Sequence, residues 1–253
     1  MTNDGARRML TPTGAMLTDP ACPDALLDTA AESLFEPRFW AARQALSAIA
    51  AGRGAAWFIE CGTQHWVLRH YRRGGFIARF AQDRYLWTGE PSVRAFAEFR
   101  LLAELARRGL PVPRPIGARY RRAGMTYRCD LIMERIAGGE PLSAVLAAAA
   151  PGEALWERIG AVIARLHRCH VDHADLNAHN ILIDPAGAVS IVDFDRGRIR
   201  APGAWSARNL RRLHRSLLKI SGPLPAGRFS PRAWESLLRG YDSAAAENHA
   251  PSL

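Results

Sequence analysis

Five polar residues fall within eight positions of one short stretch, VDHADLNAHNILID at 171–184, and an apolar run follows them directly. They are His173, Asp175, Asn177, His179 and Asn180. A second stretch, IVDFDRG at 191–197, contributes Asp193. Phosphoryl transfer needs a carboxylate that orients an attacking hydroxyl, and oxygen ligands that hold magnesium against phosphates. Asp175, Asn180 and Asp193 would lie on neighbouring loop ends around a short hairpin, so phosphoryl transfer is the chemistry that we expect.

Two other interpretations compete for the same residues. The stretch is also compatible with a polar turn in which Asn and Asp side chains cap backbone groups. Alternatively, His170, His173, Asp175 and His179 could form a metal-hydrolase cluster, although no further acidic or histidine cluster completes such a site with convincing spacing.

The elements before these motifs are mostly strands. AAWFIEC (55–61) and QHWVLRHY (64–71) are rich in β-branched and aromatic residues, and Gly62-Thr63 between them predicts a hairpin. An apolar stripe from Pro91 to Gly109 predicts one helix. RYRRAG (119–124) and YRCDLIMERI (127–136) predict another strand pair.

After Gly138-Gly139 the pattern becomes mainly helical and encloses a small hairpin with strands at 180–183 and 190–192. This order predicts an α+β chain with a small β-rich N-terminal lobe and a larger, mainly helical C-terminal lobe. We expect a loose lead-in at 1–35, the first lobe at 36–136 and the second at 137–253. Ligands commonly bind where two such lobes meet.

The chain of 253 residues is 48% apolar, which permits a large core, and its net charge of +10 comes almost entirely from arginine. Such a surface attracts nucleic acid, anionic membranes or acidic substrates, unless it serves solvation alone. The four cysteines are widely spaced, which disfavours zinc and disulfides and suits a reducing cytosol. No secretory signal is visible, and the longest apolar run, AVLAAAA at 144–150, is too short to span a membrane. We therefore expect a protein that is soluble or lies on a membrane surface.

The two polar motifs also resemble known sequences. HADLNAHN resembles the catalytic loop of protein-kinase-like enzymes, and DFD resembles their magnesium-binding Asp-Phe-Gly, with Asp195 in place of the glycine. The resemblance implies a bilobal protein-kinase-like fold, ATP and Mg²⁺. It also implies that Asp175 is the catalytic carboxylate, that His173 supports the loop, and that Asn180 and Asp193 bind the metal.

The same resemblance suggests a nucleotide site in the first lobe. Gly52 and Gly54 would form a phosphate-covering loop, although a plain turn explains them as well. Strand alternation puts Val67 and Arg69 on one face, where kinases have Ala-x-Lys. Arg69 thus replaces the usual phosphate-binding lysine, a role that His70, Arg72 or Arg73 could share.

Two further assignments complete this nucleotide site. Glu98 is the expected ion-pair partner of Arg69, with Glu104 as the alternative, and either could instead be a solvated helix residue. LIMERIAGG resembles the hinge of kinases, so backbone groups near Glu134 and Ile136 would bind adenine.

The residues after the metal loop bear on the acceptor. Aminoglycoside phosphotransferases share the same core motifs, but their polycationic acceptors favour an acidic pocket. Here RGRIR places arginines beside the presumed acceptor, which predicts an anionic acceptor with a carboxylate or phosphate. These arginines are Arg196, Arg198 and Arg200.

Three stretches, VLRHYRRGG, HADLNAHNILID and VDFDRGRIR, closely resemble the 3-deoxy-D-manno-octulosonic acid (Kdo) kinase family, from about residue 35 to 240. The resemblance implies ATP-dependent phosphorylation of the 4-hydroxyl of this sugar acid, carried on the lipid A precursor, in lipopolysaccharide core biosynthesis. It further implies a peripheral enzyme at the cytoplasmic face of the inner membrane, with no nucleic-acid partner. A kinase of another core sugar such as heptose, or of another anionic small molecule, remains an alternative. An inactive kinase fold that binds nucleic acid is disfavoured because the catalytic and metal residues are present.

Residues 205–220, WSARNLRRLHRSLLKI, predict an amphipathic helix. Its leucine face, Leu210, Leu213, Leu217 and Leu218, would pack on the core or lie on lipid. Its opposite side, here called the basic face, consists of Arg208, Arg211, Arg212, Arg215 and Lys219 and could meet anionic head groups.

Overall fold

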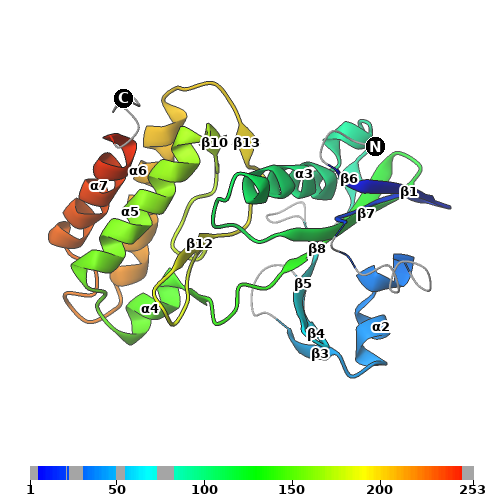
Figure 1. The fold of residues 1–253 in the computed structure, drawn as a ribbon, viewed down its shortest axis with the longest axis horizontal. Helices are drawn as coiled ribbons and strands as arrows, with labels where there is room; N and C mark the ends of the chain where they lie inside the picture. The colour runs from blue at the N-terminus through cyan, green and yellow to red at the C-terminus, as the bar shows by residue number, and fades with distance from the viewer. Residues whose placement is uncertain (1–4, 21, 23–30, 50–54, 73–82, 247–253) are drawn as a thin grey trace, which may run out of the picture. The chain divides into compact units, whose positions relative to one another are not determined.

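The chain folds into two compact units, one built on a large antiparallel sheet and one mainly helical (Figure 1). The computed structural model describes residues 5–20, 22, 31–49, 55–72 and 83–246. The predicted α+β class is confirmed. Unit 1 comprises Met1–Glu104 and Pro113–Arg135, and unit 2 comprises Leu105–Val112 and Ile136–Leu253.

The sheet of unit 1 has the strand order β1-β2-β7-β8-β5-β4-β3, and β6 pairs with β8 beside β5. All of its pairings are antiparallel, and β4 and β5 form the hairpin that the sequence predicts, with Gly62 at φ 61° in its turn. The strands are β1 (Arg7–Thr11), β2 (Gly14–Thr18), β3 (Leu46–Ile49), β4 (Ala55–Cys61), β5 (Gln64–His70), β6 (Tyr85–Leu86), β7 (Pro115–Ala123) and β8 (Thr126–Glu134).

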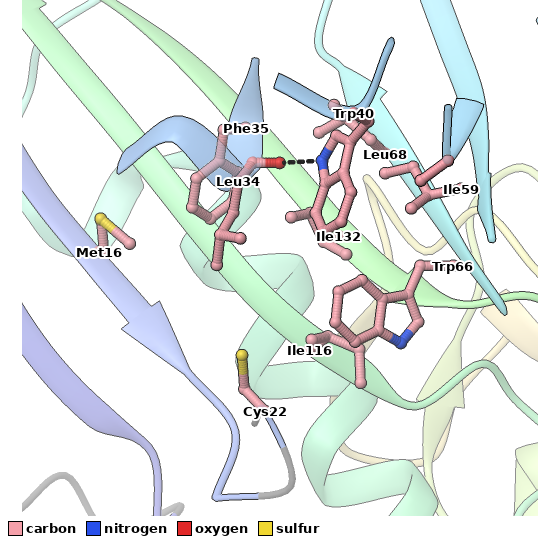
Figure 2. Close-up of a cluster of buried hydrophobic side chains, with 11 residues drawn as sticks. Met16, Cys22, Leu34, Phe35, Trp40, Ile59, Trp66, Leu68, Ile116 and Ile132 are labelled. Atoms are coloured by element: carbon pink, nitrogen blue, oxygen red, sulfur yellow. Dashed lines mark hydrogen bonds between the residues drawn. The ribbon is translucent and has the colours of Figure 1, made fainter. Parts of the chain in front are cut away.

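Strand β5 separates two environments because its side chains alternate between the two faces of the sheet. Trp66 and Leu68 are buried in a core with Trp40, from helix α2 (Pro37–Ala41). Figure 2 shows this cluster, in which Trp40 Nε1 donates a hydrogen bond of 2.7 Å to the carbonyl oxygen of Leu34, in η1 (Ala31–Phe35). Val67 and Arg69 therefore lie on the other face, as predicted.

The expectation of a loose lead-in at 1–35 is wrong for the part of it that the structure describes. Strands β1 and β2 extend the sheet by pairing β2 with β7. The buried Arg119 of β7 donates to the carbonyl oxygen of Glu32 at 3.0 Å and forms ion pairs with Asp130 at 2.8 Å and Glu36 at 2.9 Å. Pro12 is in the β1–β2 turn and Pro20 follows β2, so neither interrupts a strand.

Helix α3 (Arg94–Arg107) buries Phe96, Phe99 and Leu102, as the apolar stripe predicts. It starts three residues later than expected, because Pro91 belongs to a separate turn, η3 (Glu90–Ser92). Gly109 follows the helix at φ 68°, a conformation that favours glycine at a helix end.

Unit 2 is dominated by helices, and α5 and α7 lie side by side in Figure 1. Its short strands form two small sheets, β12-β11-β9 and β10-β13. The elements are β9 (Glu140–Pro141), α4 (Leu142–Ala148), α5 (Glu153–Arg168), β10 (Val171–Asp172), β11 (Ile181–Ile183), β12 (Val189–Ile191), β13 (Arg198–Ile199), α6 (Trp205–Ser221) and α7 (Pro231–Ala246).

Helix α6 packs into unit 2 through the predicted leucine face, with one exception. Leu213 and Leu217 are fully buried, whereas Leu218 is 53% exposed. The exception arises because Leu218 is 100° further round the helix than Leu217, beyond the buried stripe defined by Trp205, Asn209, Leu213 and Leu217. Within the described residues, no helix is long and apolar enough to cross a bilayer.

Two glycines allow α5 and α7 to approach closely. A Cβ atom at Gly160 of α5 would overlap the carbonyl oxygen of Leu237, and one at Gly240 of α7 would overlap that of Glu157. We predict that Gly160→Ala destabilises the protein by about 1–3 kcal/mol, because overpacking forces the helices apart. Urea unfolding measures the loss. Gly222→Ala is the control, since the nearest atom to its Cβ would be 3.5 Å away, and an equal loss in both variants would contradict the close packing.

His167 of α5 provides a second test of this helical core. Its ring packs against Trp205 and Tyr241, with centroids 5.2 and 5.5 Å apart, and Nδ1 lies 2.9 Å from the Tyr241 hydroxyl. Burial lowers the pKa of His167 to about 4, although Asn209 and Asp172 act to raise it. The native state therefore resists protonation that the unfolded chain accepts below pH 6.5.

We predict that stability falls as the pH drops from about 6.5 to about 4, by on the order of 3 kcal/mol from this one residue. His167→Gln, which does not titrate, should flatten the plot of unfolding free energy against pH in this window. Tyr241→Phe keeps the buried imidazole and should retain the wild-type slope. A His167→Gln slope identical to that of wild type would show that burial of this imidazole does not contribute.

Candidate functional site in the two units

The loop that follows β10 contains the first predicted site residues, and its backbone is held in an uncommon conformation. Ala174 has φ 56°, in the left-handed region that non-glycine residues seldom occupy. The Asp175 N–H donates to the carbonyl oxygen of His173 at 2.6 Å, and the Ala174 N–H donates to Asp172 Oδ1 at 3.1 Å. Backbone strain of this kind persists only where surrounding bonds enforce it, and it concentrates at functional sites.

Asn180 closes this loop. Its Nδ2 donates to the backbone carbonyl oxygen of Asp175 at 3.0 Å, and Nδ2 of Asn177 donates to the same oxygen at 2.9 Å. An amide has one oxygen and one NH₂ group, so this use of Nδ2 orients Oδ1 as the remaining oxygen ligand. The sequence spacing of five residues thus corresponds to a direct bond between the Asn180 side chain and the Asp175 backbone.

His173 links the loop to the segment that carries Asp193, which follows β12. The side chain is 2% exposed, its Nε2 donates to the Val192 carbonyl oxygen at 2.9 Å, and its ring lies 4.6 Å from that of Phe194. Burial lowers the pKa of His173, although the Val192 carbonyl and nearby carboxylates act to raise it. A neutral, buried imidazole that donates from Nε2 to Val192 is suited to holding the loop in place.

Asp193 follows Val192 at φ 65°. The Val192 N–H donates to the Asn180 carbonyl oxygen at 3.0 Å. This hydrogen bond joins the two segments that carry the predicted metal ligands. A carboxylate and an amide oxygen are hard donors, and magnesium in phosphoryl-transfer sites commonly takes one or two carboxylates together with substrate phosphates. The donor set of Asn180 and Asp193 therefore fits Mg²⁺.

The alternative hydrolase cluster is not supported. His173 bonds to Val192, while His179 Nδ1 lies 2.8 Å from Ser143 Oγ. Among the residues that the structure describes, no group of three or more His, Cys, Asp or Glu side chains could hold a metal.

Asn209 of α6 is a site residue that sequence reasoning missed. It is 3% exposed, donates from Nδ2 to Asp172 Oδ1 at 3.0 Å and accepts at Oδ1 from the His173 N–H at 3.2 Å. Arg200 adds a bond of 3.1 Å to Asp172 Oδ2. Burial acts to raise the pKa of Asp172, but the bonds from Asn209, Ala174 and Arg200 outweigh it, so the pKa is lowered. The sequence did contain a signal for it, because Asn209 is a polar residue at the i, i+4 spacing of the apolar residues that α6 buries.

The arginines predicted to bind the acceptor have different environments. Arg200 is engaged with Asp172, and Arg198 lies opposite Asp172 in the β10–β13 pair. Arg196 is exposed. The arginine that contacts Asp175 is Arg212 of α6, whose guanidinium pairs with Asp175 Oδ1.

In unit 1, the expected ion pair between Arg69 and Glu98 is present. The guanidinium makes two bonds to the Glu98 carboxylate, of 3.2 and 3.1 Å, and Glu98 is only 1% exposed. The Tyr71 hydroxyl donates to the same carboxylate, and the Arg69 guanidinium lies 4.6 Å from the centre of the Tyr71 ring. This arrangement couples β5 to α3 through one buried carboxylate.

Of the other residues predicted to bind the nucleotide, some have backbone groups that already make hydrogen bonds and others lie outside the described residues. The Glu134 N–H donates to the Arg114 carbonyl oxygen at 2.8 Å, and the Ile136 carbonyl oxygen accepts from the Gly139 N–H at 3.2 Å. The Glu134 N–H is thus used inside unit 1. His70 contacts Asp130 at 2.6 Å. Gly52, Gly54 and Arg73 lie outside the described residues.

The sequence was compared with protein families and with characterised proteins. The sequence matches the Lipopolysaccharide kinase (Kdo/WaaP) family over residues 37–241. A 3-deoxy-D-manno-octulosonic acid kinase of Xanthomonas axonopodis pv. citri (strain 306) is 53% identical over 191 residues, which cover 75% of this chain and 76% of the relative. The enzyme of the same name from Xylella fastidiosa (strain M12) is 49% identical over 212 residues, 83% of this chain and 84% of the relative.

The family match extends over most of the chain, and the relatives cover three quarters or more of it. The chain therefore belongs to the lipopolysaccharide kinase (Kdo/WaaP) family.

Proposed function

We propose that this protein is a 3-deoxy-D-manno-octulosonic acid kinase, which transfers the γ-phosphate of ATP to the 4-hydroxyl of the sugar acid on the lipid A precursor. The observation that carries the proposal is the bonded unit formed by Asp175, Asn180 and the segment leading to Asp193. Relatives of this name, about half identical to the chain, support the choice of acceptor.

Each residue of this unit has a role that its bonds support. Asp175 would orient the acceptor hydroxyl and accept its proton, because its backbone is fixed by Asn177 and Asn180. Asn180 and Asp193 would hold Mg²⁺, which neutralises phosphate charge during transfer. In unit 1, Arg69 would bind nucleotide phosphates with its position set by Glu98.

The acceptor alternatives can be separated in one assay. Purified protein is incubated with labelled ATP and either a sugar-acid acceptor or a heptose-bearing acceptor that lacks the acid. Transfer to the sugar acid supports the proposal. Transfer to heptose alone would instead identify a kinase of a different core sugar, and nucleic-acid binding without transfer to any acceptor would favour the inactive-kinase alternative.

Asp175→Asn tests the catalytic carboxylate. An amide cannot accept the hydroxyl proton at neutral pH, so we expect transfer to fall by at least about 100-fold. The affinity for Mg-ATP should stay within about twofold of wild type, because Asn180 and Asp193 are unchanged. A fall in transfer of only about tenfold would raise the activation free energy by about 1.4 kcal/mol, which is less than loss of the proton acceptor should cost. Single-turnover transfer and nucleotide binding are measured together.

Asp184→Asn serves as the matched control. Asp184 Oδ1 accepts from the Ala188 N–H at 2.7 Å in the β11–β12 turn, and an asparagine oxygen can make the same bond. This variant removes one carboxylate charge from the hairpin that follows the Asp175 loop, without touching that loop. Wild-type transfer by Asp175→Asn would remove Asp175 from the catalytic role.

We also propose that the enzyme works as a peripheral protein at the cytoplasmic face of the inner membrane, held there by the basic face of α6. The arginines of this face are exposed, while Leu213 and Leu217 are buried in unit 2 and contribute to folding. Attraction to anionic lipid is worth about 1 kcal/mol per basic residue near the surface. Charge would therefore supply most of the binding.

Replacing Arg208, Arg211 and Arg215 with Gln should lower the partition coefficient onto anionic vesicles by roughly 100-fold, at about 1 kcal/mol per residue. Co-sedimentation with the vesicles measures it. Arg212 is left intact because it contacts Asp175. Turnover of a short soluble acceptor should change much less than vesicle binding. A control with Arg38, Arg158 and Arg232 replaced by Gln has the same charge change elsewhere. Equal vesicle binding by both triple variants would place membrane contact outside α6.

A further inference from the structure

Arg212 contacts the proposed catalytic base directly, from a distant part of the sequence. The guanidinium NH2 atom pairs with Asp175 Oδ1, and the two side chains are 48% and 42% exposed. Helix α6 is anchored in unit 2 by the buried side chains of Asn209, three residues before Arg212, and Leu213, the residue after it. The position of the guanidinium is therefore set by the fold of unit 2.

This ion pair has little value for stability. Exposed pairs of this kind contribute about 0–1 kcal/mol, so the fold does not require Arg212. It does affect Asp175, because the guanidinium occupies Oδ1, which an acceptor hydroxyl would need to approach. A group that competes for the guanidinium would release Asp175 for catalysis.

The chemistry around Arg212 selects an anion as that group. A guanidinium has five N–H donors in a planar fork that matches a carboxylate, and one nitrogen is used in the contact with Asp175. Helix α6 contains no acidic residue, and Arg208, Arg211 and Arg215 are exposed near Arg212 on the same helix. Their summed potential would draw an anionic acceptor group toward this position.

We infer that Arg212 binds the carboxylate of the acceptor sugar and thereby places the acceptor hydroxyl beside Asp175. The inference rests on the proposed function and adds a specificity residue to it. Arg200, one of the arginines first expected to do this, is engaged with Asp172. A neutral sugar would leave Arg212 on Asp175, so acceptor choice and activation of the base would be one event.

The test crosses two protein forms with two acceptors. A soluble glycoside of the sugar acid and its neutral carboxamide are compared in wild type and Arg212→Gln, with acceptor KM, kcat and ATP KM measured for each. Wild type should prefer the acid by roughly 10–100-fold in kcat/KM, the range expected for a hydrogen-bonded charge pair. Arg212→Gln should lose most of that preference while its ATP KM stays within about twofold, a difference below 1 kcal/mol.

Two further variants make the result specific. Arg212→Lys keeps the charge and should recover part of the preference for the acid. Arg232→Gln removes an exposed arginine from α7 and should behave as wild type. Equal losses with acid and carboxamide in Arg212→Gln would overturn the inference, because they would show that Arg212 only orients Asp175.

The source of the anion and the proposed function are tested separately. A loss that appears only with a phosphorylated lipid-linked acceptor would overturn the carboxylate assignment, because phosphate would then be the ligand. If wild type phosphorylates neither acceptor, the proposed function fails. Calorimetric binding of the acid and the carboxamide to wild type and Arg212→Gln then decides the inference alone, and equal affinities would overturn it.

Discussion

The loop that carries Asp175 depends on one buried amide, the side chain of Asn209. It bonds at the same time to the Asp172 carboxylate and to the backbone N–H of His173, and so attaches helix α6 to the start of the catalytic loop. A buried polar side chain without partners would cost on the order of 1–3 kcal/mol, so these bonds strongly favour one position of the loop. The same loop contains the uncommon backbone at Ala174 and the buried imidazole of His173, and Asn177 and Asn180 hold its Asp175 carbonyl oxygen.

A second single residue has the same importance in unit 1. Glu98 is buried and accepts from both Arg69 and Tyr71, so the sheet and helix α3 meet at one carboxylate. Loss of either donor would leave a buried charge with fewer bonds, which is much more costly than loss of an exposed pair. Each unit therefore fixes its functional side chains by satisfying a buried polar group, and apolar packing such as that around Trp40 provides the rigid frame.

The sequence predicted correctly those features that depend on residues close together in the chain. Alternation in β5 placed Arg69 and Val67 on one face, and the five-residue spacing from Asp175 to Asn180 corresponded to a hydrogen bond within one loop. The contacts of Asn209 and Arg212 with the loop were not predicted, because they join residues 36 or more positions apart and depend on how α6 packs. The N-terminal strands were missed because each has only five residues and because Pro12 and Pro20, which favour irregular structure, stand close to them.

The Arg69, Tyr71 and Glu98 arrangement also has a consequence for regulation. An arginine stays protonated at every physiological pH, and Tyr71 adds a second bond that no nucleotide has to supply. Helix α3 is thus secured to the sheet by the chain's own residues, which disfavours control by swinging this helix in and out. A kinase built in this way would have helix α3 in position against the sheet before any nucleotide binds.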